Sequence, residues 1–112
     1  MLEQKLSELT EELKNSEEYT KYLAARERAE ENDSTATLLR EYHRAQMRVQ
    51  ALVMQNITEG PDFDRFRSLS DALQTDADAA SFLLAEYRLK KVLGDVFKTL
   101  THAVDLDLGF LE

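Results

Sequence analysis

The 112-residue chain contains no cysteine and no tryptophan, and it has only three glycines and one proline. The absence of cysteine excludes disulfides, thiolate zinc sites, cysteine-ligated iron–sulfur clusters and cysteine nucleophiles. The scarcity of glycine and proline leaves long uninterrupted stretches rich in Leu, Ala, Glu, Lys, Arg and Gln, which favour helix. The chain is therefore expected to form one small all-α domain over residues 1–112.

Two further features are missing, a long apolar run and an excess of positive charge. No run approaches the roughly 20 apolar residues of a membrane span, and no basic-then-apolar leader opens the sequence. The formal net charge of −8 opposes the phosphate backbone of nucleic acids, whose binding depends on clustered Lys and Arg. These absences predict a cytoplasmic protein that binds neither membranes nor nucleic acids directly.

Apolar spacing and helix-breaking residues together predict five helices. Ser16, Asp33 and Thr75 are each placed to cap the start of a helix. Gly60 and Pro61 form the clearest turn, because glycine stops a helix and proline prevents its continuation. The predicted helices cover residues 1–14 (an amphipathic helix with a leucine seam), 16–31, 34–58, 63–73 and 76–105, followed by a tail at 106–112.

The third and fifth predicted helices are the longest and carry the most regular apolar stripes. In the third helix the stripe steps by four and three residues, which is the packing geometry of a helical hairpin. We therefore expect an antiparallel hairpin or bundle of the two long helices, with shorter N-terminal and connecting helices. The stripe of the last helix is wide enough for two packing partners.

One partner of the last helix is expected to be a second copy of the chain, since a broad exposed apolar patch is a liability in a monomer. This predicts a homodimer or a higher oligomer. The residues expected to serve packing or self-association follow one heptad seam: Phe82, Leu89, Leu93, Val96 and Leu100.

Three arginines, Arg40, Arg44 and Arg48, recur at steps of four on the third helix. Residues four apart lie on one ridge of a helix, so the three cations are expected to face the same direction. We predict that they contact an acidic protein partner. The alternative is that they pair with carboxylates of their own chain or of a sister subunit, which contributes little at exposed positions.

No arrangement of residues predicts a catalytic or metal site. Helical di-iron proteins use Glu-x-x-His pairs, but Arg40 and Thr99 occupy the positions three before His43 and His102. Phosphate-binding loops and nucleophile elbows are also missing from the sequence. We therefore expect no catalytic residue, no metal, no cofactor and no enzymatic activity.

An alternative is a helical metal-dependent nucleotide pyrophosphohydrolase, whose magnesium ligands follow a Glu-Glu-x-x-Glu pattern and a later Glu-x-x-Asp pattern. The nearest candidates are Glu27, Glu30 and Glu31, with Glu59 and Asp62. The last two flank Gly60-Pro61 and therefore belong to a turn. Solvated acids that complement helix dipoles are the favoured interpretation.

Several stretches, read together, resemble the YlbF/YmcA family of small helical bacterial proteins over about residues 16–104. They are Ser16–Leu23, the helix break Asn32-Asp33 leading to Leu38–Tyr42 and Gln46, the turn Gly60-Pro61, and Phe82–Glu86 continuing through Leu89, Leu93, Val96 and Leu100. Where the family often has Asn-Pro or Asp-Pro at helix starts, this chain has Asp33-Ser34 and Asp76-Ala77.

The resemblance implies a non-enzymatic accessory protein. Members of the family act in complexes with one another and modulate ribonuclease Y in messenger RNA maturation, with effects on competence, sporulation and biofilm formation. Short YheA-type members share the fold without an agreed role. The resemblance thus implies family paralogues and RNA-processing proteins as partners, beside self-association. A purely structural helical oligomer is the remaining alternative.

Overall fold

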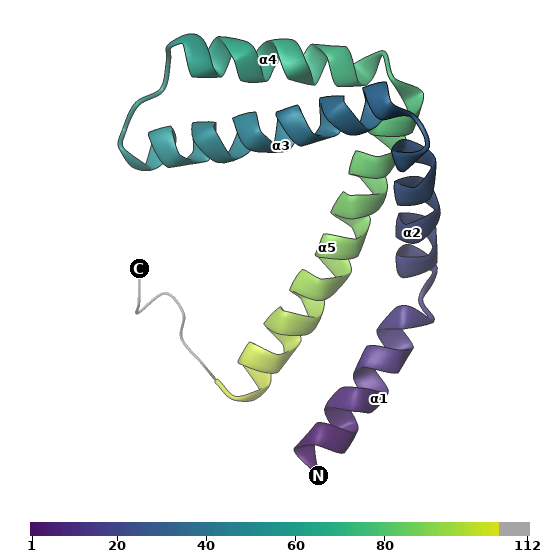
Figure 1. Cartoon of the computed structure of the whole chain (residues 1–112). Helices are drawn as coiled ribbons and strands as arrows, with labels where there is room; N and C mark the ends of the chain where they lie inside the picture. The colour runs from purple at the N-terminus through teal and green to yellow at the C-terminus, as the bar shows by residue number, and fades with distance from the viewer. Residues whose placement is uncertain (106–112) are drawn as a thin grey trace. The chain divides into compact units, whose positions relative to one another are not determined.

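A computed structural model of the chain describes residues 1–105, and these residues form five α-helices and no strand (Figure 1). The all-α prediction is confirmed. The predicted tail at 106–112 lies outside the described residues. The helices are α1 (Leu2–Lys14), α2 (Glu17–Glu30), α3 (Asp33–Met54), α4 (Pro61–Gln74) and α5 (Ala77–Ala103).

The chain divides into two compact units, and the division falls inside α2 and α5. One unit is continuous and runs from Leu23 to Leu83, so it contains the end of α2, all of α3 and α4, and the start of α5. The other combines Met1–Tyr22 with the chain from Leu84 onward, so it contains α1, the start of α2 and most of α5.

The Leu23–Leu83 unit is organised around an antiparallel hairpin of α3 and α4 (Figure 1). The rings of Tyr42 and Phe66 stack across the hairpin with centroids 5.3 Å apart. Its edges carry ion pairs, with Arg48 Nε 3.4 Å from Asp62 Oδ2 and Arg65 Nη2 3.7 Å from Glu41 Oε2. The buried apolar residues of this unit are mostly small: Ala25, Ala29, Leu39, Ala45, Leu73, Ala79 and Phe82.

The turn between α3 and α4 comes earlier than the sequence predicts, because α3 ends at Met54 and not at residue 58. Asn56 has a φ of 65°, its amide donates to Val53 O, and the Ile57 amide donates to Leu52 O at 3.0 Å. This is a Schellman closure, in which asparagine takes the left-handed position because its short polar side chain tolerates it. Gly60, at φ 134°, then leads into Pro61, the first residue of α4.

The caps of the second, third and fifth helices test three predictions. Ser16 is confirmed, since its hydroxyl accepts from the Tyr19 amide. The Asp33 prediction is wrong, because the Asn32 side chain accepts from the amides of residues 34 and 35. The Thr75 prediction is wrong as well, because Asp76 accepts from the Ala79 amide at 3.1 Å. At both wrongly predicted positions two neighbouring residues have side chains suited to an N-cap, and the backbone conformation decides which of the two takes that position.

Asp76 also ties the start of α5 to the start of α3. Its second carboxylate oxygen accepts a hydrogen bond from the Thr35 hydroxyl at 2.7 Å, and Thr35 is only 2% exposed. The Thr35 hydroxyl, together with the Ala79 amide, lowers the pKa of the Asp76 carboxyl below its usual value. One carboxylate thus connects two helices that begin 44 residues apart, at positions 33 and 77.

The second unit is less well packed. Leu9 and Leu13 of α1 are half-buried, whereas Leu2 and Leu6 of the same seam are exposed. Lys21 forms an ion pair with Glu17 at 2.6 Å. The hydrogen bond from Lys21 and its positive charge lower the pKa of the Glu17 carboxyl, and the charge of Arg88 on α5 makes a smaller contribution in the same direction.

Candidate protein-interaction surface

The C-terminal half of α5, with the turn residue that follows it, displays an apolar face made of Leu93, Phe97, Leu100 and Val104, which we call the α5 face. Successive members are four, three and four residues apart, so they lie on one side of the helix. Their exposed fractions are 46%, 57%, 56% and 74%. Contiguous exposed apolar patches of this kind mark protein or membrane interaction sites.

The five residues predicted for packing or self-association fall into three environments. Phe82 is buried in the Leu23–Leu83 unit at 8% exposure. Leu89 and Val96 are half-buried. Leu93 and Leu100 belong to the exposed α5 face. Only the last two therefore offer apolar surface that a partner could still cover.

The three predicted partner-contacting arginines are all exposed on α3. Arg48 forms an ion pair with Asp62 at the edge of the α3–α4 hairpin. Arg40 Nη2 donates to the Thr37 hydroxyl at 3.3 Å, and within residues 1–105 neither Arg40 nor Arg44 forms an ion pair. Two of the three cations thus remain available for an acidic partner, while the third is engaged within its own unit.

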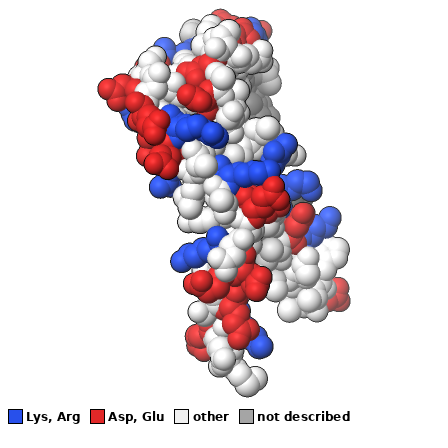
Figure 2. Space-filling view, turned by 90° about the vertical axis from the view of Figure 1, so that its right-hand side faces the viewer, with Lys and Arg blue, Asp and Glu red and all other residues white. Residues whose placement is uncertain are grey.

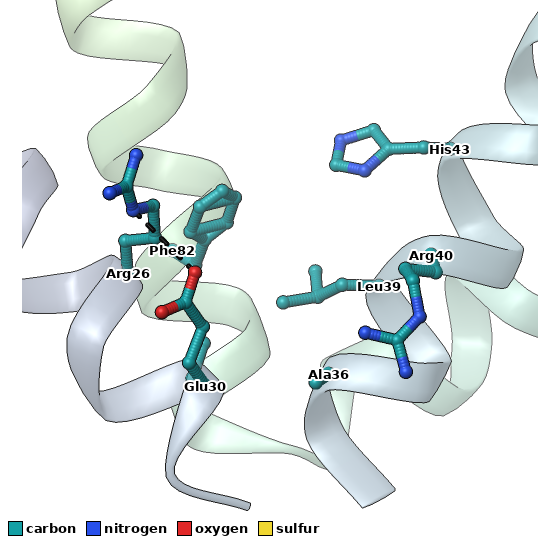
Figure 3. A pocket seen from close by; sticks show the side chains of 8 residues that line it. Arg26, Glu30, Ala36, Leu39, Arg40, His43 and Phe82 are labelled. Carbon is teal, nitrogen blue, oxygen red and sulfur yellow. Dashed lines mark ion pairs between the residues drawn. The ribbon is translucent and has the colours of Figure 1, made fainter. Parts of the chain in front are cut away.

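A pocket of about 180 Å³ opens between α2 and α3 in the Leu23–Leu83 unit (Figure 3). Leu39 and His43 point into it from α3, and Phe82 of α5 faces them from across the pocket. Arg26 and Glu30 of α2 form an ion pair of 3.6 Å on the opposite side. The remaining lining residues are Ala29, Ala36 and Arg40. The site therefore has an apolar interior and a charged rim.

Sequence reasoning missed this pocket, because its lining comes from three separate helices. Arg40 and Phe82 were both noticed, but on separate stripes. Their common position depends on the turn at 31–32 that brings α2 back beside α3 and on the burial of the α5 start. No local pattern reports such a juxtaposition.

Charge elsewhere on the surface is mixed. On the face shown in Figure 2, Lys and Arg alternate with Asp and Glu and do not gather into one basic patch. Many of the ion pairs join residues one turn apart on the same helix, as in Arg67–Asp64 and Lys91–Asp95. Exposed pairs of this type contribute only about 0.3–0.5 kcal/mol each.

The residues relevant to metal chemistry are dispersed. Across residues 1–105 no group of three or more His, Asp or Glu side chains is placed to hold a metal ion. Glu27, Glu30 and Glu31 are exposed, and Asp62 is engaged by Arg48. None of the helices between Leu2 and Ala103 is both long and apolar enough to cross a membrane.

These features define a class: a small all-α protein whose distinctive surfaces are an apolar helix face, a small apolar pocket, and two arginines that form no ion pair within residues 1–105. Comparison with known proteins makes the assignment specific. The family model described as "Control of competence regulator ComK, YlbF/YmcA" matches residues 2–105. The chain therefore belongs to the YlbF/YmcA family, as its sequence resemblance indicated.

Similar proteins of known sequence cover nearly the whole chain. A UPF0342 protein of Symbiobacterium thermophilum is 36% identical over 106 residues, covering 93% of this chain and 94% of its own length. A UPF0342 protein of Halothermothrix orenii is 28% identical, covering 94% and 88%. The crystal structure of Bacillus subtilis RicA in complex with RicF contains a similar fold, with a TM-score of 0.64, 21% sequence identity and 93% of each chain covered.

Proposed function

We propose that this protein is a non-enzymatic, cytoplasmic accessory protein that regulates other proteins by binding them. In this proposal the α5 face mediates self-association as a homodimer or higher oligomer. Arg40 and Arg44 contact acidic protein partners. Membership of a family described by its control of a competence regulator supports a regulatory role.

The observation that carries the proposal is the exposure of the four large apolar side chains of the α5 face, which form one stripe along the end of α5 and the residue after it. Full burial of a Val, Leu or Phe side chain contributes about 1.5–3 kcal/mol. Because these four side chains are about half exposed or more, covering them offers several kilocalories per mole of favourable free energy. No comparable benefit comes from the exposed ion pairs.

Family paralogues are the first candidates for outside partners. RicA, whose structure resembles this one, was crystallised in complex with RicF. The wider family role in ribonuclease Y-dependent messenger RNA maturation extends the proposal to RNA-processing proteins. The net charge of −8 favours contact through protein partners over direct contact with RNA.

The self-association is tested with neighbouring charge substitutions on α5. Leu100→Asp places a carboxylate in the centre of the α5 face, whereas Thr99→Asp places the same charge on an exposed position pointing away from it. We expect sedimentation equilibrium to show an oligomer for the wild type and for Thr99→Asp, and a monomer for Leu100→Asp. A monomeric wild type at micromolar concentration contradicts the proposal.

The arginine contact is tested by affinity capture from an extract of the native cell, with mass spectrometry as the readout. We expect Arg40→Glu/Arg44→Glu to lose partners that the wild type recovers, with an unchanged helical circular dichroism spectrum. Arg28→Glu, an exposed charge reversal on α2, is the matched control. If the double variant and the control capture the same proteins, the arginine assignment is wrong.

A further inference from the structure

A line of exposed apolar side chains continues along α3 from the pocket. His43, which points into the pocket (Figure 3), is followed four residues later by Met47 and seven residues after that by Met54. Residues at these separations lie on one side of a helix. Met47 is 70% exposed and Met54 is 85% exposed. We call this surface, from the pocket to Met54, the α3 face.

Two arginines form a positive edge beside the α3 face. Arg40 lines the pocket, and Arg44 lies one turn further along the same ridge. Neither forms an ion pair within residues 1–105, whereas Arg26, on the opposite side of the pocket, pairs with Glu30. The α3 face therefore offers apolar surface next to two charges that no carboxylate of the described chain neutralises.

The pocket is large enough to hold one apolar side chain of a partner. Its interior is formed by Leu39 and Phe82, which are 6% and 8% exposed, and by Ala29. An apolar cavity of about 150 Å³ in another protein binds benzene, and this pocket has a volume of about 180 Å³. A phenylalanine ring or a leucine side chain therefore fits it, and its burial there removes apolar surface of both molecules from water.

The spacing along the α3 face matches the side chains of a second helix. From His43 to Met47 is about 6 Å along the axis of α3, and from Met47 to Met54 is about 10 Å. A helix lying along α3 presents apolar residues at the same intervals, at positions i, i+4 and i+11. Amphipathic helices bind apolar surfaces in this way, and methionines are frequent on such surfaces because their side chains adapt to the partner. Acids one turn apart on that helix have the spacing of Arg40 and Arg44.

We propose that the α3 face binds an acidic amphipathic helix of a partner protein. One large apolar side chain of that helix occupies the pocket, and others cover Met47 and Met54. Two of its carboxylates, one turn apart, pair with Arg40 and Arg44. This inference rests on the proposed function, in which the arginines contact acidic partners, and it adds the form of the partner and the side chain that anchors it.

Synthetic peptides test the proposal with the full-length protein, by fluorescence anisotropy at constant salt. The probe is an amphipathic helix of about 18 residues, long enough to be helical. It carries Phe, Leu and Leu at positions i, i+4 and i+11, and two Glu four residues apart beside the Phe. We expect it to bind the wild type. Replacing its Phe by Ala, or both Glu by Lys, should weaken binding by about 10-fold or more, because the first removes the anchor and the second places cations beside the arginines.

Matched protein variants locate the contact. Ala36→Phe fills the pocket from α3, and Ala24→Phe places the same side chain at an exposed position of α2 outside the pocket. Met47→Glu introduces a negative charge into the α3 face, and Ser68→Glu introduces one on the exposed surface of α4. We expect Ala36→Phe and Met47→Glu to weaken peptide binding by about 10-fold or more, and the two controls to bind as the wild type does.

Several results would overturn the proposal. One is the absence of peptide binding to the wild type, and another is equal affinity for the Phe and Ala peptides. Equal binding by Met47→Glu and Ser68→Glu overturns it as well, and this comparison decides the outcome even if Ala36→Phe fails to fold. Binding of the wild type to anionic phosphatidylglycerol vesicles, without binding to the peptide, would assign the α3 face to a membrane and overturns the proposal too.

Affinity capture from the native cell extract separates this proposal from the proposed function. If Arg40→Glu/Arg44→Glu loses captured proteins while Met47→Glu and Ala36→Phe retain them, docking of a helix on the α3 face is overturned and the arginine contact stands. If all of these variants capture the same proteins as the wild type, both are overturned. Parallel losses in all of them support both.

Discussion

The hydrogen bond between Thr35 and Asp76 is expected to be a major source of stability in the Leu23–Leu83 unit. Asp76 Oδ1 accepts from the Ala79 amide and caps α5, while Oδ2 accepts from the buried Thr35 hydroxyl at 2.7 Å. Asp76→Ala removes both bonds. The substitution should therefore destabilise the start of two helices at the same time.

The magnitude follows from the two losses. Removing an N-cap side chain costs about 1 kcal/mol, within a range of 0.5–2. Leaving a buried hydroxyl without its partner costs about 1–3 kcal/mol, and Thr35 is 2% exposed. We expect Asp76→Ala to lower the free energy of unfolding by about 2–4 kcal/mol, which for a chain of this size lowers Tm by about 8–16 °C.

Thermal and urea unfolding, followed by circular dichroism at one protein concentration, measure the effect. Thr35→Val removes the hydroxyl at nearly constant volume, and the double variant completes a cycle. We expect the two single effects to be non-additive by about 0.5–3 kcal/mol because the residues share one hydrogen bond. Additive effects would refute the reasoning.

The same bond predicts a pH dependence. The Thr35 hydroxyl and the Ala79 amide lower the pKa of Asp76 in the folded state. A carboxyl whose pKa is lowered on folding contributes stability above its unfolded pKa and loses it as the pH falls through the folded pKa. The stability difference between the wild type and Asp76→Asn should therefore be constant near neutral pH and shrink below about pH 4. A difference that persists unchanged at pH 2 contradicts this.

Two further predictions concern packing and the α3 turn. Leu39→Ala should lower the free energy of unfolding by about 2–5 kcal/mol because the Leu39 side chain is buried. Leu93 is 46% exposed, so Leu93→Ala should lower it by less than half as much when the protein is a dilute monomer. Comparable losses for the two variants in urea unfolding would contradict the burial pattern. Asn56→Ala should lower the free energy of unfolding by about 1 kcal/mol and Asn56→Gly should not, because only the alanine side chain opposes the left-handed backbone. Equal melting temperatures for the two variants would show that the φ of 65° at this position is not maintained.

The sequence by itself determined the helices and the family. Long stretches without glycine or proline, a leucine-rich periodicity and the Gly60-Pro61 turn specify helical segments, because these are local properties of the backbone. The order and spacing of such segments also carried the resemblance to the YlbF/YmcA family, which the match over residues 2–105 confirms. Helix ends were less certain where two capping residues adjoin, as at Asn32-Asp33.

Only the tertiary structure decided which apolar residues are covered and which remain exposed. Periodicity placed Phe82, Leu93 and Leu100 on one seam, but it did not report that the first is buried and the others are exposed. The Thr35–Asp76 bond and the pocket at Leu39 and Phe82 depend on residues that are about 40 positions apart. Contacts over such separations arise from how helices pack, and a periodic pattern specifies a face without specifying what covers it.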